Sequence, residues 1–267
     1  MSKSAEAHGA LKIEDIDVEV TGLKLHVRHL KLSADAPTIV YLHDSLGSIA
    51  LWRHFPESLC RGTACHGLIY DRQGHGKSCG FSEARTPEYL HKEAAILEQL
   101  LAQEGIENAI LFGHSDGGSI ALIAAALYPQ RIRGVISEGA HVFVEEITLE
   151  GIRAAKEQLA TTNLRERVAR YHGDKTDAVF SAWIDTWLSS EYRYFNMEAL
   201  LPQIKCPVLA IQGIDDEFGS PLQVDAIASQ AGGRALGKII DNARHTPHKE
   251  AATVTLELVG DFVRSII

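Results

Sequence analysis

A five-residue stretch, Gly-His-Ser-Asp-Gly at positions 113–117, constrains this chain more than any other feature. The apolar run 109–112 before it is typical of a short buried strand, and the run 119–128 after it of a helix. A sharp strand-to-helix turn strains the backbone of its central residue and needs small neighbours on both sides. Such a turn exposes the hydroxyl of Ser115 and, beside it, the backbone N–H of Asp116. The stretch therefore predicts a serine nucleophile with half of an oxyanion hole.

The length of the chain, its charge and its apolar runs restrict the classes of protein to which it can belong. Strand-like and helical runs alternate along nearly all of the 267 residues, which favours one layered α/β core. The 26 basic and 35 acidic residues give a formal net charge of -9, which argues against nucleic acid and anionic membranes as partners. No apolar run approaches the ~20 residues of a membrane helix, and the first ten residues lack the apolar core of a signal peptide. We therefore expect a cytoplasmic protein that acts on a small molecule.

The cysteines and histidines predict no metal site. Cys60, Cys65, Cys79 and Cys206 are scattered and show neither C-x-x-C nor Cys/His ligand spacing, so a disulfide framework is not indicated either. The thirteen histidines stand mostly alone in polar segments, which is typical of surface residues or of residues that support a site from behind. We expect no metal and no cofactor, and the sequence leaves the oligomeric state open.

Buried strands with polar, glycine-rich exits predict a mostly parallel sheet. The chain opens with an antiparallel hairpin of strands 16–20 and 23–29, joined by a turn at Thr21-Gly22. Continuous apolar runs predict the following strands, at 38–42, 67–70, 109–112, 133–137, 208–212 and 238–241. Helical patterns occur at 86–105 and 119–128, and a closing helix is expected at 249–266. The predicted fold class is α/β, a central sheet flanked by helices.

The segment 141–200 interrupts the strand pattern. Apolar residues recur at helical spacing along two stretches of it, around Ile152 and around Trp183. The segment has no repeats and no linker-like run, so we interpret it as an elaboration of one domain. We expect residues 1–140 and 201–267 to form the core and residues 141–200 to form a small helical cap over the catalytic face.

A serine hydroxyl is a poor nucleophile at neutral pH, so it needs a general base and a carboxylate that orients this base. Where the acid and the base follow later strands of the same sheet, the chain order is Ser, Asp, His. His245 follows the last predicted strand and is the predicted base. His248, three residues later, is interpreted as a residue of the helix start or of the surface.

The acid is expected in the loop after the strand at 208–212. Asp216 is preferred over Asp215 because strand-end loops of this kind read G-x-x-D, and Asp216 is three residues after Gly213. Glu138, at the end of the preceding predicted strand, is the alternative acid.

The second oxyanion donor is expected in the loop after the strand at 38–42. This loop begins with His43 and Asp44, and the backbone N–H of Ser45 or Leu46 is the predicted donor. Asp44 stands where the commoner His-Gly-x-x-Gly pattern has its first glycine.

Several motifs occur together in one order along the chain. They are Leu42-His43 with Gly47-Ser48, the segment 70–78 (YDRQGHGKS), the segment 113–118 (GHSDGG) and the late Asp216 and His245. This combination resembles the α/β-hydrolase superfamily over nearly the whole chain. The resemblance implies that fold, with Ser115, Asp216 and His245 as the catalytic triad.

A narrower resemblance concerns the residue after the nucleophile. The segments 115–118 (SDGG), 128–129 (YP), 150–153 (EGIR) and 206–207 (CP) are similar to the valacyclovir hydrolases, which cleave α-amino-acid esters. In that family this aspartate contacts the ammonium group of the substrate, so the resemblance implies the same role for Asp116. A partly desolvated carboxylate beside the ester would pair with an α-ammonium group. The alternative is that Asp116 caps or bonds the following helix, whose N-terminus favours an anion.

The sequence thus predicts a cofactor-free serine hydrolase that cleaves a small carboxylic ester through an acyl-enzyme on Ser115. General esters and α-amino-acid esters are both candidate substrates. A carbon-carbon bond hydrolase of aromatic degradation with the same triad is one alternative, and a non-catalytic ligand receptor on the same fold is another. Haloalkane dehalogenase chemistry is disfavoured because it needs a carboxylate nucleophile at position 115.

Overall fold

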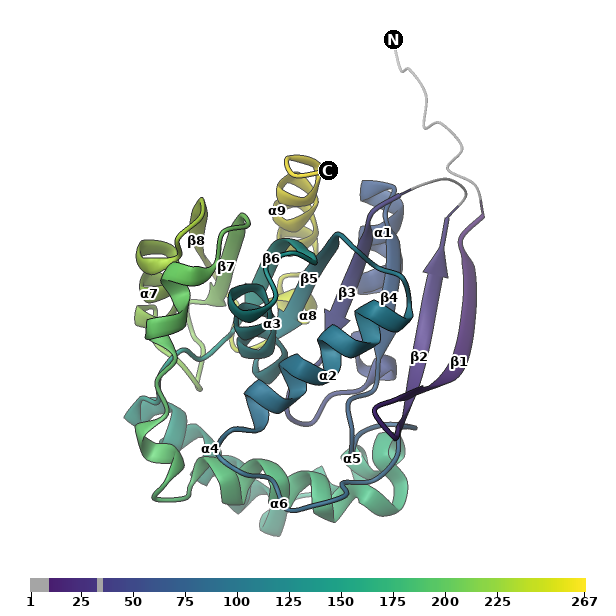
Figure 1. The fold of residues 1–267 in the computed structure, drawn as a ribbon. Coiled ribbons are helices and arrows are strands. Elements are labelled where there is room, and N and C mark those ends of the chain that lie inside the picture. Colours follow the sequence, from purple (N-terminus) through teal and green to yellow (C-terminus); the bar gives the residue numbers. More distant parts are fainter. Residues whose placement is uncertain (1–9, 33–35) are drawn as a thin grey trace.

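The computed structural model describes residues 10–32 and 36–267. Within them, eight strands form one sheet in the order β1-β2-β4-β3-β5-β6-β7-β8 (Figure 1). The strands are β1 (Lys12–Val20), β2 (Leu23–Lys31), β3 (Thr38–Leu42), β4 (His66–Tyr70), β5 (Ala109–His114), β6 (Ile132–Glu138), β7 (Val208–Gly213) and β8 (Ala235–Ile240). The β1–β2 and β2–β4 pairs are antiparallel, and all other neighbours are parallel. The predicted class, α/β with a mostly parallel sheet, is confirmed.

Helices cover both faces of the sheet, with α1, α8 and α9 on one face and α2, α3 and α7 on the other (Figure 1). Their bounds are α1 (Phe55–Thr63), α2 (Tyr89–Gln103), α3 (Asp116–Leu127), α7 (Leu222–Gln230), α8 (Pro247–Glu250) and α9 (Ala252–Arg264). Alternate residues of a strand point to opposite faces. In β3, Val40 and Leu42 pack with residues of α2 and α3, whereas Ile39 and Tyr41 pack with residues of α1 and α9. Burial on both faces explains the continuous apolar runs in the sequence.

Three helices, α4 (Glu146–Thr161), α5 (Leu164–His172) and α6 (Thr176–Trp187), lie across the end of the sheet where the parallel strands terminate (Figure 1). Short 3-10 helices complete the described elements: η1 (Ile49–Trp52), η2 (Gly173–Lys175), η3 (Tyr192–Tyr194) and η4 (Glu198–Gln203). Residues of α4 and α6 belong to the same hydrophobic cluster as α3. No helix in residues 10–32 and 36–267 is long and apolar enough to cross a membrane.

The hairpin prediction is confirmed, and Thr21 (φ 51°) and Gly22 (φ 81°) make its turn. The closing helix is not continuous as predicted, because Ala251 (φ −129°, ψ 48°) breaks it into α8 and α9. β8 begins at Ala235, earlier than predicted. It is the edge strand and mostly exposed, so an apolar run does not mark its start. α3 also begins earlier than predicted, directly after Ser115.

Candidate active site

Ser115 stands between β5 and α3 with a positive backbone torsion, φ 55° and ψ −118°. A Cβ atom on Gly113 would lie 2.0 Å from the carbonyl oxygen of Gly117, and one on Gly117 would lie 2.0 Å from that of Leu42. Side chains at either position would force strand and helix apart. The structure thus contains the strained turn with two small neighbours that the sequence predicted.

His245 and Asp216 are directly hydrogen-bonded. The Nδ1 atom of His245 lies 2.9 Å from Oδ1 of Asp216 and 3.0 Å from Oδ2, so the ring donates to a carboxylate that is itself buried. Burial alone would raise the pKa of Asp216, but the charge and hydrogen bond of His245 lower it below its usual value. Burial opposes a charge on His245, yet Asp216 raises the pKa of this imidazole above its ordinary value. Asp215, the alternative, is exposed.

Glu138, the alternative acid, and His248 bond to each other. The main-chain N–H of His248 donates to Oε1 of Glu138 at 2.7 Å, and the ring Nδ1–H donates to Oε2. His248 begins α8 as predicted but does not lie at the surface. It is 3% exposed and its ring packs against Trp52 at 4.7 Å between centroids. Burial lowers the pKa of His248, whereas the charge and hydrogen bonds of His248 lower the pKa of buried Glu138 against the effect of burial.

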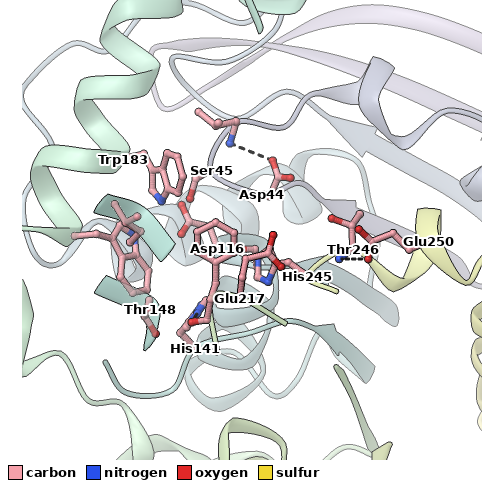
Figure 2. Close-up of a pocket in the computed structure, with 15 residues that line it drawn as sticks. Asp44, Ser45, Asp116, His141, Thr148, Trp183, Glu217, His245, Thr246 and Glu250 are labelled. Carbon is pink, nitrogen blue, oxygen red and sulfur yellow. Dashed lines mark hydrogen bonds between the residues drawn. The ribbon is translucent and has the colours of Figure 1, made fainter. Parts of the chain in front are cut away.

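One cavity of about 210 Å³ lies between the ends of the parallel strands and the helices α4 and α6 (Figure 2). Ser115 and His245 line it together, with Ser45, Leu46 and Asp116. The remaining lining residues come from the loop after β3, from α4 and α6, from the loops after β6, β7 and β8, and from α8: Asp44, His141, Thr148, Ile152, Trp183, Trp187, Glu217, Phe218, Thr246 and Glu250. The structure therefore brings all the predicted site residues to one place, with Asp216 behind His245.

The loop after β3 (residues 43–48), the predicted oxyanion loop, makes a tight turn in which Gly47 N–H donates to the carbonyl oxygen of Asp44 at 3.2 Å. The backbone N–H of Leu46 donates to Oδ1 of Asp44 at 3.1 Å, so it is already occupied. Neither Ser45 nor Asp116 donates its backbone N–H to an acceptor within the described part of the chain. Of the two donors that the sequence left open in this loop, Ser45 is therefore the one that remains free.

Asp116 is held by cations and a phenol. Its side chain is 1% exposed, and Oδ1 accepts a hydrogen bond from the Tyr89 hydroxyl at 2.8 Å. Oδ2 lies 3.4 Å from Nη2 of Arg72 and 3.7 Å from Nη1 of Arg85. Arg85 also lies over the Tyr89 ring, 4.3 Å from its centroid. Asp116 lies in the first turn of α3, but its carboxylate bonds to these side chains and does not cap the helix.

The histidines are more buried than their polar sequence context implied. Among the histidines that the structure describes, six are buried, namely His43, His75, His114, His141, His172 and His248. His172, at the end of α5, accepts a hydrogen bond from Gly76 N–H at Nδ1 (2.9 Å) and donates from Nε2 to the Leu46 carbonyl (3.0 Å). Helix α5 is thus bonded to the predicted oxyanion loop. Only the tertiary fold reveals these contacts, because no local spacing marks them.

One group of side chains has the composition of a metal site. Potential ligand atoms of His114, Glu138 and His248 lie within 4.8 Å of one another, and all three residues are buried. Both oxygens of Glu138 accept hydrogen bonds from His248, and His114 Nε2 donates to the His245 carbonyl at 2.9 Å. Hydrogen bonds therefore already use most of the donor atoms that a metal would need.

Curated relatives cover most of the chain. It is 26% identical to the human Serine hydrolase BPHL over 204 residues, which are 74% of this chain and 69% of the relative. It is 29% identical over 161 residues to the 2-succinyl-6-hydroxy-2,4-cyclohexadiene-1-carboxylate synthase of Escherichia fergusonii, 60% of this chain and 58% of the relative. These similarities indicate a hydrolase and leave its substrate open.

Solved structures share the fold. The enol-lactonase from Burkholderia xenovorans LB400 superposes with a TM-score of 0.73 at 22% identity and covers 93% of this chain and 99% of its own. A bacterial membrane phospholipase A superposes with a TM-score of 0.78 at 18% identity, over 95% of this chain and 86% of its own. The family model described as alpha/beta hydrolase fold matches residues 37–196, more than half of the chain. This chain therefore belongs to the alpha/beta hydrolase fold family.

Proposed function

We propose that this protein is a serine hydrolase that cleaves a small carboxylic ester through an acyl-enzyme on Ser115. One observation carries the proposal. His245 is oriented by a hydrogen bond to Asp216 and lines the same cavity as Ser115, which stands on a strained turn at the N-terminus of α3. A base that a carboxylate orients, on the same cavity as a serine hydroxyl, is the arrangement that activates serine.

In the first half-reaction, Ser115 Oγ attacks the ester carbonyl while His245 Nε2 takes the hydroxyl proton. The tetrahedral oxyanion is stabilised by the backbone N–H groups of Asp116 and Ser45. Its collapse breaks the bond to the alcohol oxygen, which receives the proton from His245. In the second half-reaction, His245 activates water, and the attack of this water on the acyl-enzyme releases the acid and restores Ser115. Asp216 stabilises the imidazolium in both steps.

The substrate class rests on Asp116. An α-ammonium group would need an anionic partner, but the carboxylate of Asp116 already has Arg72 and Arg85 as counter-ions. We therefore favour a general carboxylic ester over an α-amino-acid ester. Product analysis with a vinylogous 1,5-diketone distinguishes the carbon-carbon bond hydrolase, which employs the same triad.

The test is covalent labelling with a fluorophosphonate. The wild-type protein should be labelled at Ser115, and Ser115→Ala should lose the label while retaining its circular dichroism spectrum. Ser58→Ala, on the far α1 helix, is the matched control and should be labelled like the wild type. Labelling of Ser115→Ala would show that another residue is the nucleophile, and an unlabelled wild type without turnover would favour the ligand receptor.

A further inference from the structure

One carboxylate connects the oxyanion loop to the residue before the nucleophile. Asp44 Oδ1 accepts the backbone N–H of Leu46 at 3.1 Å, and Asp44 Oδ2 lies 3.3 Å from Nδ1 of His114. On its other side, the His114 ring presents Nε2 to the main-chain oxygen of His245 at 2.9 Å. The ring centroids of His114 and His245 are 5.1 Å apart. Oxyanion loop, nucleophile turn and general base thus meet at one buried imidazole.

The contacts of His114 favour a proton on each of its ring nitrogens. A carbonyl oxygen at 2.9 Å from Nε2 requires a proton on Nε2, because that oxygen can only accept. A carboxylate oxygen at 3.3 Å from Nδ1 is favourable only if Nδ1 also carries a proton. Both requirements are met by the imidazolium form. Burial raises the pKa of Asp44, but His114, Lys249 and His43 hold it well below its usual range, so the group beside the ring is a carboxylate.

Two other buried histidines give a contrast. His43 accepts the Arg72 N–H at Nε2 (3.0 Å) and faces the Asp44 carbonyl with Nδ1 (2.7 Å). His172 likewise accepts a main-chain N–H at one nitrogen and faces a carbonyl with the other. One proton satisfies each of these rings, so both are neutral in this geometry.

The groups around His114 come from several elements. Asp44 belongs to the oxyanion loop, Glu138 to the end of β6, and His245 and His248 to the segment after β8. Glu138 already accepts two hydrogen bonds from His248, so Asp44 is the carboxylate that faces the ring of His114 with an oxygen.

We propose that Asp44 and His114 are positioning residues: a His114 imidazolium, paired with Asp44, holds the oxyanion loop and the main chain of His245 in register for reaction at Ser115. The pair also gives a reason for the aspartate where related loops have glycine. Asp44 turns Leu46 N–H away from the oxyanion and leaves that of Ser45 for it. The kinetic part of this inference rests on the proposed function, whereas the protonation of His114 does not.

The protonation is tested by NMR of protein labelled with ¹⁵N-histidine, with His114→Gln to assign the His114 signals. Both ring nitrogens of His114 should carry protons at neutral pH, and His43 and His172 should serve as internal standards for singly protonated rings. Asp44→Asn tests the role of the Asp44 charge directly. Its amide can donate to Nδ1, so His114 should lose one proton and keep its Nε2–H on the His245 carbonyl. A singly protonated His114 ring in the wild type at pH 6–8 would overturn the imidazolium.

The positioning role is tested by ester kinetics, with active sites counted by fluorophosphonate. His114→Leu should lower kcat about 10- to 100-fold per active site, with KM changed by less than about threefold, because the reacting groups are misplaced while the pocket remains. His114→Gln can keep a donor to the His245 carbonyl and should lose less, as should Asp44→Asn compared with Asp44→Ala. His54→Gln, at an exposed position before α1, should behave as wild type.

These readouts separate the possible failures. If His114→Leu lowers only the melting temperature and leaves kcat per active site unchanged, the positioning role is wrong and His114 is a structural residue. Should His114→Leu fail to fold, the comparison of Asp44→Asn with Asp44→Ala decides, and equal losses would contradict the role. If the wild type neither labels nor turns over esters, the proposed function fails, and the NMR result still decides the state of His114.

Discussion

Glu138 accepts two hydrogen bonds from His248, one from its main-chain N–H at 2.7 Å and one from its ring Nδ1–H. This second pair of histidine and carboxylate lies close to the pair of His245 and Asp216, because the His114 ring contacts both histidines. Its centroid is 5.0 Å from that of His248 and 5.1 Å from that of His245. Of His245 and His248, only His245 lines the cavity that Ser115 also lines. We therefore expect the pair of His245 and Asp216 to act in the proposed reaction and the pair of His248 and Glu138 to act in stability.

Glu138→Ala should destabilise the protein by about 3 kcal/mol, because it leaves two buried donors of His248 without an acceptor. The free energy of unfolding in urea measures this effect.

Asp216→Asn should instead lower kcat on the order of 10⁴-fold, since the imidazole of His245 loses the acceptor that fixes its tautomer. A large loss of kcat in folded Glu138→Gln, with little loss in Asp216→Asn, would make Glu138 the catalytic acid.

The pH profile should reveal the Asp216 charge. Acylation needs His245 without its second proton, so kcat/KM should fall as the pH drops through the pKa of His245. Asp216 raises this pKa, so the acid limb should lie above the value of about 6.5 for an ordinary histidine. Residual activity of Asp216→Asn should show the limb at lower pH, because burial then acts without the opposing charge. An acid limb at the same pH in both proteins would contradict the coupling.

Asp116 should give little preference for an α-ammonium group. The ratio of kcat/KM for a valine ester to that for the matching 3-methylbutanoate ester should stay below about tenfold, which is roughly 1.4 kcal/mol of discrimination. Arg85→Met removes one counter-ion of Asp116 and should raise the ratio, whereas Arg153→Met, on the exposed face of α4, should not. A wild-type ratio well above tenfold would reassign Asp116 as an ammonium anchor.

Gly117→Ala should destabilise the fold by about 2 kcal/mol or more, because its Cβ would lie 2.0 Å from the main-chain oxygen of Leu42. Gly62→Ala is the matched control. Apart from the neighbouring turns of α1 itself, no described atom lies within 4 Å of a Cβ at this position, so the gain in helix propensity should stabilise the protein by up to about 1 kcal/mol. Thermal unfolding of the two variants measures the difference, and similar melting temperatures would contradict the close contact.

Local chemistry in the sequence determined the sheet, the turn at Ser115 and the identity of the predicted triad residues. Apolar runs of the central strands are continuous because both faces are buried, and the glycines around Ser115 are required by backbone contacts. Both signals are local and therefore readable. The start of β8 carried no such signal because an edge strand with exposed residues needs no apolar run.

The tertiary structure decided which partners the polar residues take. From the sequence, Asp116 could either bind a substrate ammonium group or cap a helix. The fold places Arg72, Tyr89 and Arg85 against its carboxylate, from positions at least 27 residues away along the chain. It likewise joins Asp44 to His114 and Glu138 to His248. A buried charged side chain needs an oppositely charged partner within a few ångströms, and that partner can come from any distance along the chain. The sequence alone thus determined which reactive side chains this protein has. Only the packing of the fold decided which of them have bonding partners and which line the cavity beside Ser115.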